Sequence, residues 1–232
     1  MEAASIFYIF FALCCSFALP ALVIYGINYY SEEKISLKRA FKNTRAHEKP
    51  FLALIFATTI LGSIAIALQP YSPGQHYAAL LFAYVLIVLS FIDSKLYILP
   101  DFLTFPLIAT GLLVALLGLF IPLLQAFLGM FFGYSSLWLI NRSFLLLRNK
   151  EGMGQGDFKL LAAIGAWVGP MQLPLIIFAA ALIGLLMAAV TRPFSRATLG
   201  SAIPFGPALA LAGFLSLLYG DNFLNWYLSL FL

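Results

Sequence analysis

The chain has 232 residues, of which 63% are hydrophobic and only 9% are charged. This composition excludes a soluble globular domain and predicts a membrane protein with several spans. The net charge of +4 does not indicate a nucleic-acid partner, because the cations lie in short loops between apolar stretches.

The apolar stretches run continuously, without the alternation of strands in a membrane barrel, so we expect an all-α polytopic membrane protein. Eight stretches are predicted to be transmembrane helices, at about residues 4–25, 51–68, 77–91, 102–121, 122–140, 158–169, 173–190 and 206–219. They are expected to form a single membrane-embedded domain over residues 1–232.

Two of these predictions leave alternatives open. The stretch 158–169 has only 12 residues, roughly 18 Å of helix, against a hydrocarbon core of roughly 30 Å. It therefore either crosses with help from its flanking residues or is buried in protein. Residues 224–232 form an aromatic-bearing tail that either extends the last helix or lies in the membrane interface.

The distribution of cations predicts the orientation. With eight crossings and the N-terminus outside, all 13 Lys and Arg residues fall on the cytoplasmic side, in the stretches 30–50, 92–101, 141–159 and 192–205. Residues 30–50 are expected to form a basic cytoplasmic loop, with a short interfacial helix as the alternative. The first cation is Lys34, so the N-terminus lacks the basic region of a signal peptide, and the first span is expected to be retained.

Three acids, Asp93, Asp101 and Asp157, are predicted to lie near helix ends on the cytoplasmic side. An acid at the end of a membrane segment is costly and needs a reason. Two aspartates can hydrolyse a peptide when one deprotonates a water and the other polarises the carbonyl. Two neighbouring carboxylates cannot comfortably both ionise, so such a pair shares a proton.

Asp157 follows a glycine-rich stretch, Gly152-Met-Gly-Gln-Gly-Asp157. The glycines predict a close approach between the backbone and a bound chain, and a positive φ that other residues disfavour. Asp157 is expected in the first turn of the next helix, where the helix dipole favours its ionised form. A turn followed by a helix cap explains the motif equally well, and the same alternative applies to Asp93 and Asp101.

Three blocks of sequence carry a resemblance to a known family: FIDSKLYILPDFLTFP at 91–106, GMGQGDFKLLAAIGAW at 152–167 and IPFGPALA at 203–210. They total 40 residues, about a sixth of the chain. In these blocks the chain resembles the bacterial type IV prepilin peptidases, which are Gly-x-Gly-Asp intramembrane aspartyl proteases.

The resemblance implies that Asp93 and Asp157 are catalytic and that Asp101 has a supporting role. Substrate-binding or supporting roles are also assigned to Pro100, Gly154, Gly156 and Lys159. The implied reaction removes the leader of type IV prepilins or type II secretion pseudopilins at the cytoplasmic face of the inner membrane. The implied partners are these substrates and membrane lipid, without nucleic acid, cofactor or metal.

The chain departs from the family pattern in its first cytoplasmic loop. Many relatives carry two Cys-x-x-Cys pairs there, in a zinc-binding segment, and also methylate the new pilin N-terminus. Residues 30–50 contain no cysteine and one histidine, His47, which cannot form a structural zinc site. This departure puts the methyltransferase activity in question and leaves the protease residues untouched.

Two other classes of function remain open from the residues. A transporter would use acids deep within its spans and show internal repeats, but we find no repeat, and the acids lie at predicted helix ends. A membrane scaffold of a secretion or pilus machine would use the acids only as caps.

Overall fold

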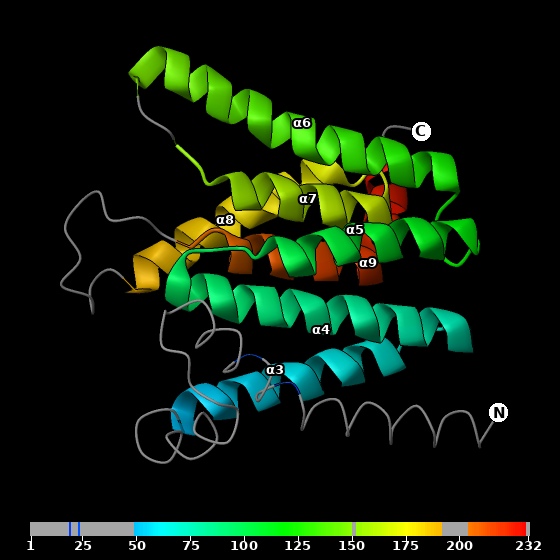
Figure 1. Cartoon of the computed structure of the whole chain (residues 1–232). Helices are drawn as coiled ribbons and strands as arrows, with labels where there is room; N and C mark the ends of the chain where they lie inside the picture. Colours follow the sequence, from blue (N-terminus) through cyan, green and yellow to red (C-terminus); the bar gives the residue numbers. More distant parts are fainter. Residues whose placement is uncertain (1–18, 20–22, 24–48, 150–151, 192–203, 231–232) are drawn as a thin grey trace. The chain divides into compact units, whose positions relative to one another are not determined.

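The computed structural model describes residues 19, 23, 49–149, 152–191 and 204–230. The regular elements of these residues are all α-helices, as the sequence predicts (Figure 1): α3 (Lys49–Ala67), α4 (Pro73–Leu96), α5 (Asp101–Leu116), α6 (Leu123–Arg148), α7 (Gln155–Val168), α8 (Leu173–Thr191) and α9 (Gly206–Ser229). Most of the predicted span at 4–25, of the basic loop and of 192–205 lies outside the described residues.

Each of the seven remaining predicted spans corresponds to one helix. By length and composition, α4, α6, α8 and α9 could cross a membrane, and α3 and α5 contain shorter apolar helices. Helix α9 continues to Ser229, so residues 224–229 of the aromatic tail extend the last helix. This was one of the two arrangements expected for the tail.

The third predicted span, at about 77–91, lies within a longer helix, because α4 begins at Pro73 and continues through Asp93 to Leu96. The polar residues at this end fit a helix because Ser94 donates its hydroxyl to the Ser90 carbonyl, at 2.7 Å. The helix ends where Tyr97 adopts a left-handed conformation, with φ of 56°.

The described helices fall into two compact units, one ending at Ile98 and one beginning at Leu99. In the first unit, α3 and α4 pack together across a short connection. Ser72 caps α4 in a capping box with Gln75, and Pro73 begins the helix. Ser63 of α3 and Tyr84 of α4 share a hydrogen bond of 2.9 Å between the helices.

The second unit is built around α7, which packs against α5, α6 and α9, and Figure 1 shows it between α5 and α6. Every residue from Leu160 to Val168 is buried. The short stretch at 158–169 is therefore largely enclosed by other helices of its unit.

Glycines allow the helices to approach α7 closely. A Cβ on Gly129 of α6 would collide with the backbone of Gly165 of α7, and a Cβ on Gly165 would collide with Gly129. One turn later, a Cβ on Gly133 would lie 2.6 Å from the Leu161 carbonyl oxygen. Glycines four residues apart are typical of helix pairs whose backbones touch within membranes.

Helices α5 and α9 also contact α7. The Trp167 indole donates a buried hydrogen bond of 2.9 Å to the Leu107 carbonyl of α5. A Cβ on Gly111 would lie 2.7 Å from the Trp167 ring, and one on Gly213 of α9 would lie 2.8 Å from Ile164. The C-terminal half of α7 is therefore enclosed by three helices.

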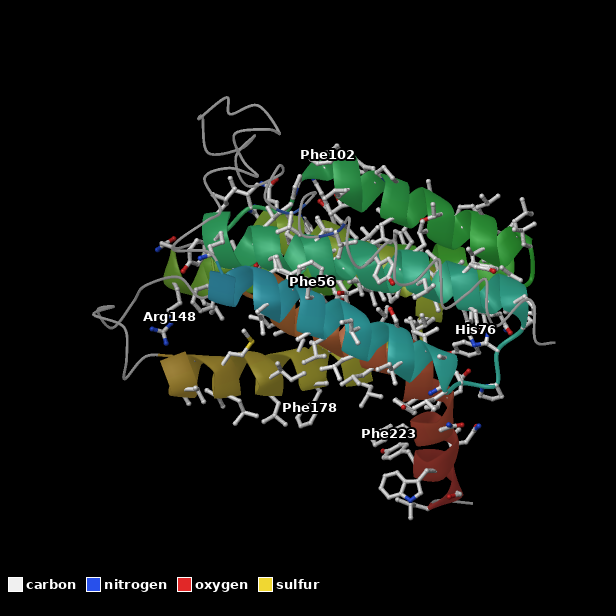
Figure 2. All side chains as sticks on the ribbon, turned by 90° about the horizontal axis from the view of Figure 1, so that it is seen from below. Phe56, His76, Phe102, Arg148, Phe178 and Phe223 are labelled. Atoms are coloured by element: carbon white, nitrogen blue, oxygen red, sulfur yellow. The ribbon has the colours of Figure 1, made fainter. Side chains whose placement is uncertain are left out.

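Large apolar side chains point outward from this unit. Figure 2 shows Phe102, Phe178 and Phe223 projecting from α5, α8 and α9, and the first two are 55% and 69% exposed. In water such a surface would favour aggregation, but it suits helices that face lipid tails.

Candidate active site

Asp157 lies in the first turn of α7, as the sequence predicts. Gly154 occupies the N-cap position in an extended conformation, and Asp157 is the third residue of the helix. The Asp157 amide donates to the Gly154 carbonyl at 3.2 Å, and the side chain is buried. An acid in this position faces the positive end of the helix dipole.

The predicted conformation of the motif glycines is wrong. Positive φ occurs in the described glycines only at Gly118 and Gly169, and Gly154 has φ of −72°. Close packing explains Gly152 and Gly156 instead. A Cβ on Gly152 would lie 2.8 Å from the Phe144 ring, and one on Gly156 would lie 2.8 Å from the Leu99 Cβ.

A side chain of α6 holds the beginning of this motif. The Asn141 Oδ1 accepts hydrogen bonds from the amides of Gly152, at 3.0 Å, and Met153, at 3.1 Å. Sequence reasoning missed Asn141 because a single asparagine at the end of an apolar helix belongs to no motif. It lies in the stretch 141–159, which was expected on the cytoplasmic side after the span at 122–140.

Two of the predicted supporting residues form an ion pair. The Lys159 Nζ lies 2.6 Å from the Asp101 Oδ1 and 5.4 Å from the centre of the Phe105 ring. Pro100 is the N-cap residue of α5, and its carbonyl accepts the amides of Leu103 and Thr104 at 3.1 Å. The contact between Asp101 and Lys159 joins the first turn of α5 to the second turn of α7.

Asp93 lies in the last turn of α4, where its side chain is buried and its carbonyl accepts the Tyr97 amide at 2.9 Å. It belongs to the unit that ends at Ile98, whereas Pro100, Asp101 and the glycine motif belong to the unit that begins at Leu99.

The buried carboxyl groups of Asp93 and Asp157 are of a kind that can exchange a proton with a substrate or a water. Within the described ranges, no three His, Cys, Asp or Glu side chains gather closely enough to hold a metal ion. The arrangement around Asp157 is suited to acid–base chemistry on a chain that reaches the start of α7.

The comparison with protein families identifies the same segment. The sequence profile described as the type IV leader peptidase family matches residues 80–189, which include Asp93, Asp101, Asn141 and Asp157. Several curated proteins are also similar over most of this chain. Over this segment the chain is similar to the type IV leader peptidase family.

Three of these relatives carry the name prepilin leader peptidase/N-methyltransferase. The protein of Aeromonas hydrophila is 45% identical over 179 residues, covering 77% of this chain and 62% of the relative. That of Dichelobacter nodosus is 42% identical, covering 72% and 57%, and that of Pseudomonas aeruginosa is 45% identical, covering 67% and 53%. The chain therefore spans between half and two thirds of the length of each of these relatives. No solved structure matches the chain.

Proposed function

We propose that this chain is a membrane aspartic endopeptidase that cleaves the leader peptide from type IV prepilins or type II secretion pseudopilins. The observation that carries the proposal is the buried Asp157 in the first turn of α7, within the region matched by the leader peptidase family. The names of the relatives supply the substrate class.

Asp93 and Asp157 are the proposed catalytic pair. One carboxylate takes a proton from the attacking water, while the other, in its protonated form, polarises the scissile carbonyl. Three features support this assignment: both residues lie in the resembling blocks, both are buried, and both lie within one turn of a helix end.

Asp101, Lys159, Pro100, Gly154 and Gly156 have supporting roles in this proposal. The ion pair between Asp101 and Lys159 links the N-terminal part of α7 to the start of α5. Gly156 allows the chain at Leu99 to pass beside that turn. At Gly154, the extended backbone without a side chain leaves space for a substrate chain.

The proposed topology has eight crossings, an outside N-terminus and an active site that faces the cytoplasm from the inner membrane. The four long apolar helices support membrane insertion, and the positions of the Lys and Arg residues support the orientation. In this topology a basic leader would lie in the cytosol, with the hydrophobic helix of the substrate in the membrane.

The proposal covers leader cleavage, which is only one of the two activities in the relatives' name. The absence of cysteine from residues 30–50 argues against the zinc-binding segment that accompanies methylation in many family members. Mass spectrometry of a co-expressed prepilin would measure cleavage and any added methyl group on the same peptide.

The test of the catalytic pair uses Asp93→Asn and Asp157→Asn. Each variant should lose cleavage by at least about 100-fold, because acid–base catalysis by a positioned group contributes about 10²- to 10⁴-fold. Asp221→Asn is a matched control, since an asparagine there can still accept the 2.8 Å hydrogen bond from Gln172. Wild-type cleavage by both aspartate variants would refute the proposal, and a scaffold would keep its function in both.

A further inference from the structure

The C-terminal end of α6 runs past the start of α7 (Figure 1). Asn141 and Phe144 lie in this part of α6, three residues apart and therefore on the same face of the helix. Both contact Gly152: Asn141 accepts its amide, and the Phe144 ring fills the space where a Cβ would lie.

These contacts lie directly before the proposed catalytic turn. Met153, whose amide also donates to Asn141, is followed by the N-cap residue Gly154, and Asp157 is the third residue of the helix. Because peptide planes are rigid, fixing the amides of Gly152 and Met153 restricts the direction in which the chain enters α7. That direction sets where the first turn presents the Asp157 carboxylate.

The two hydrogen bonds of Asn141 are largely open to solvent. The bond to Gly152 is exposed and the bond to Met153 is only partly buried. If Asn141 were lost, both amides could turn to water, so the fold would remain while the loop became less restricted. A side chain with this behaviour suits a role in positioning better than a role in stability.

We propose that Asn141, supported by Phe144, is a positioning residue for Asp157, which sets the backbone at Gly152 and Met153 through two amide hydrogen bonds. The inference rests on the proposed peptidase function. Its chemical basis is that one side-chain oxygen accepts hydrogen bonds from two neighbouring amides, which lie 11 and 12 residues further along the chain.

The test compares two substitutions of similar size in the full-length protein. Asn141→Leu removes the acceptor. For cleavage of a prepilin, kcat should fall by at least about 10-fold, because a small displacement of a catalytic group lowers the rate. KM should stay within about twofold of the wild-type value. Asn141→Asp keeps an oxygen acceptor and should restore most of the rate. Ser143→Ala is the control on the same turn, since its hydroxyl bonds only to the Leu139 carbonyl of its own helix.

A measurement independent of activity uses hydrogen–deuterium exchange. In Asn141→Leu, peptides that cover residues 152–157 should exchange faster, while peptides within 160–168 should be unchanged. If peptides that cover residues 152–157 exchange at the same rate in Asn141→Leu as in the wild type, the proposal is wrong.

A compensating pair tests Phe144. Gly152→Ala places a Cβ 2.8 Å from the Phe144 ring and should lower kcat, while Phe144→Ala in the same chain should recover part of the loss by removing the ring. Absence of recovery would overturn the supporting role of Phe144.

The outcomes separate the two proposals. If Asp157→Asn is inactive and Asn141→Leu has a wild-type kcat, the positioning role is wrong and the peptidase function stands. If Asp93→Asn and Asp157→Asn both cleave normally, the peptidase assignment itself is wrong, and the exchange measurement still decides whether Asn141 holds the loop.

Discussion

Glycines allow close contacts at both ends of α7, but the contacts differ between the two ends. Around Leu160–Val168, Gly129 and Gly133 of α6 bring one helix backbone onto another. At the N-terminal end, Gly152 and Gly156 lie against the side chains of Phe144 and Leu99. Polar contacts differ as well, with a buried indole–carbonyl bond at Trp167 and an exposed ion pair at Lys159.

This difference indicates how the helix combines rigidity with a site. Backbone contacts between helices cannot relax, so the C-terminal half has one fixed position within its unit. Contacts made by side chains, solvent-exposed hydrogen bonds and an ion pair leave the first turn adjustable. Substitutions in the C-terminal half should therefore reduce stability, and those in the N-terminal half should mainly reduce cleavage.

The largest effect is expected from Gly165→Ala or Gly129→Ala. Each added Cβ would collide with the backbone of the other glycine. No side-chain rotation can relieve this collision, because the atoms that meet are a Cβ and backbone atoms. We expect the free energy of unfolding to fall by more than about 3 kcal/mol, the upper part of the range for overpacked cores. Thermal unfolding in detergent and the yield of monodisperse protein would measure it.

Gly184→Ala of α8 is the matched control. Its Cβ would lie 3.5 Å from the nearest atom, on the Phe205 ring, which is an ordinary contact. Alanine is about 0.5–1 kcal/mol more favourable than glycine inside a helix, so this variant should be as stable as the wild type or slightly more stable. A Gly165→Ala protein as stable as Gly184→Ala would contradict the comparison.

The positions of the helices could be predicted because long apolar stretches between charged loops have few other solutions in lipid. Their ends could not be predicted from apolarity alone. At the end of α4, Ser94 satisfies its hydroxyl within the helix, so the polar sequence does not terminate it. The depth of burial of α7 also required the structure, since it depends on glycines in α6 and α9.

For the candidate site, the location of Asp157 followed from a glycine-rich stretch before an apolar run. The pairing of Asp101 with Lys159 did not follow, because the residues lie 58 positions apart. Asn141 carried no signal in the sequence, because its role depends on how far α6 extends beside the motif. The wrong prediction of positive φ treated glycine as a conformational requirement, whereas Gly152 and Gly156 provide space.

The second prediction separates the two glycines of Gly-x-Gly-Asp. Gly156→Ala brings a Cβ 2.8 Å from the Leu99 Cβ, and should cost about 1–3 kcal/mol of stability and at least about 10-fold in cleavage, since it displaces the first turn. Gly154→Ala meets only the Asp157 Oδ2, at 3.7 Å, with a φ of −72° that alanine adopts.

Gly154→Ala should therefore fold normally, with a loss of at most about 1 kcal/mol for alanine at an N-cap. Cleavage by the purified variants, measured together with their unfolding temperatures, distinguishes two roles for Gly154. A stable Gly154→Ala enzyme that retains cleavage shows that glycine there is not required. A stable but inactive one shows that the missing Cβ makes room for the substrate.

The smallest effect is expected from the ion pair between Asp101 and Lys159. Its side chains are 55% and 26% exposed, and exposed pairs contribute about 0–1 kcal/mol because water and salt screen them. Asp101→Asn and Lys159→Met should each lower the unfolding free energy by less than about 1 kcal/mol. They should also reduce cleavage by less than about 10-fold, because the pair only supports the first turn.

The exchanged pair, Asp101→Lys with Lys159→Asp, isolates the electrostatic part of this contact. If the attraction between the charges holds the first turn, the double variant should cleave faster than Asp101→Lys alone. That advantage should shrink as salt rises from about 0.05 M to 1 M, where the screening length falls to about 3 Å. If Lys159 instead acts directly on the substrate, the exchange should leave cleavage as low as in Lys159→Asp alone. That outcome would mean that Lys159 binds the leader and does not act by supporting α7.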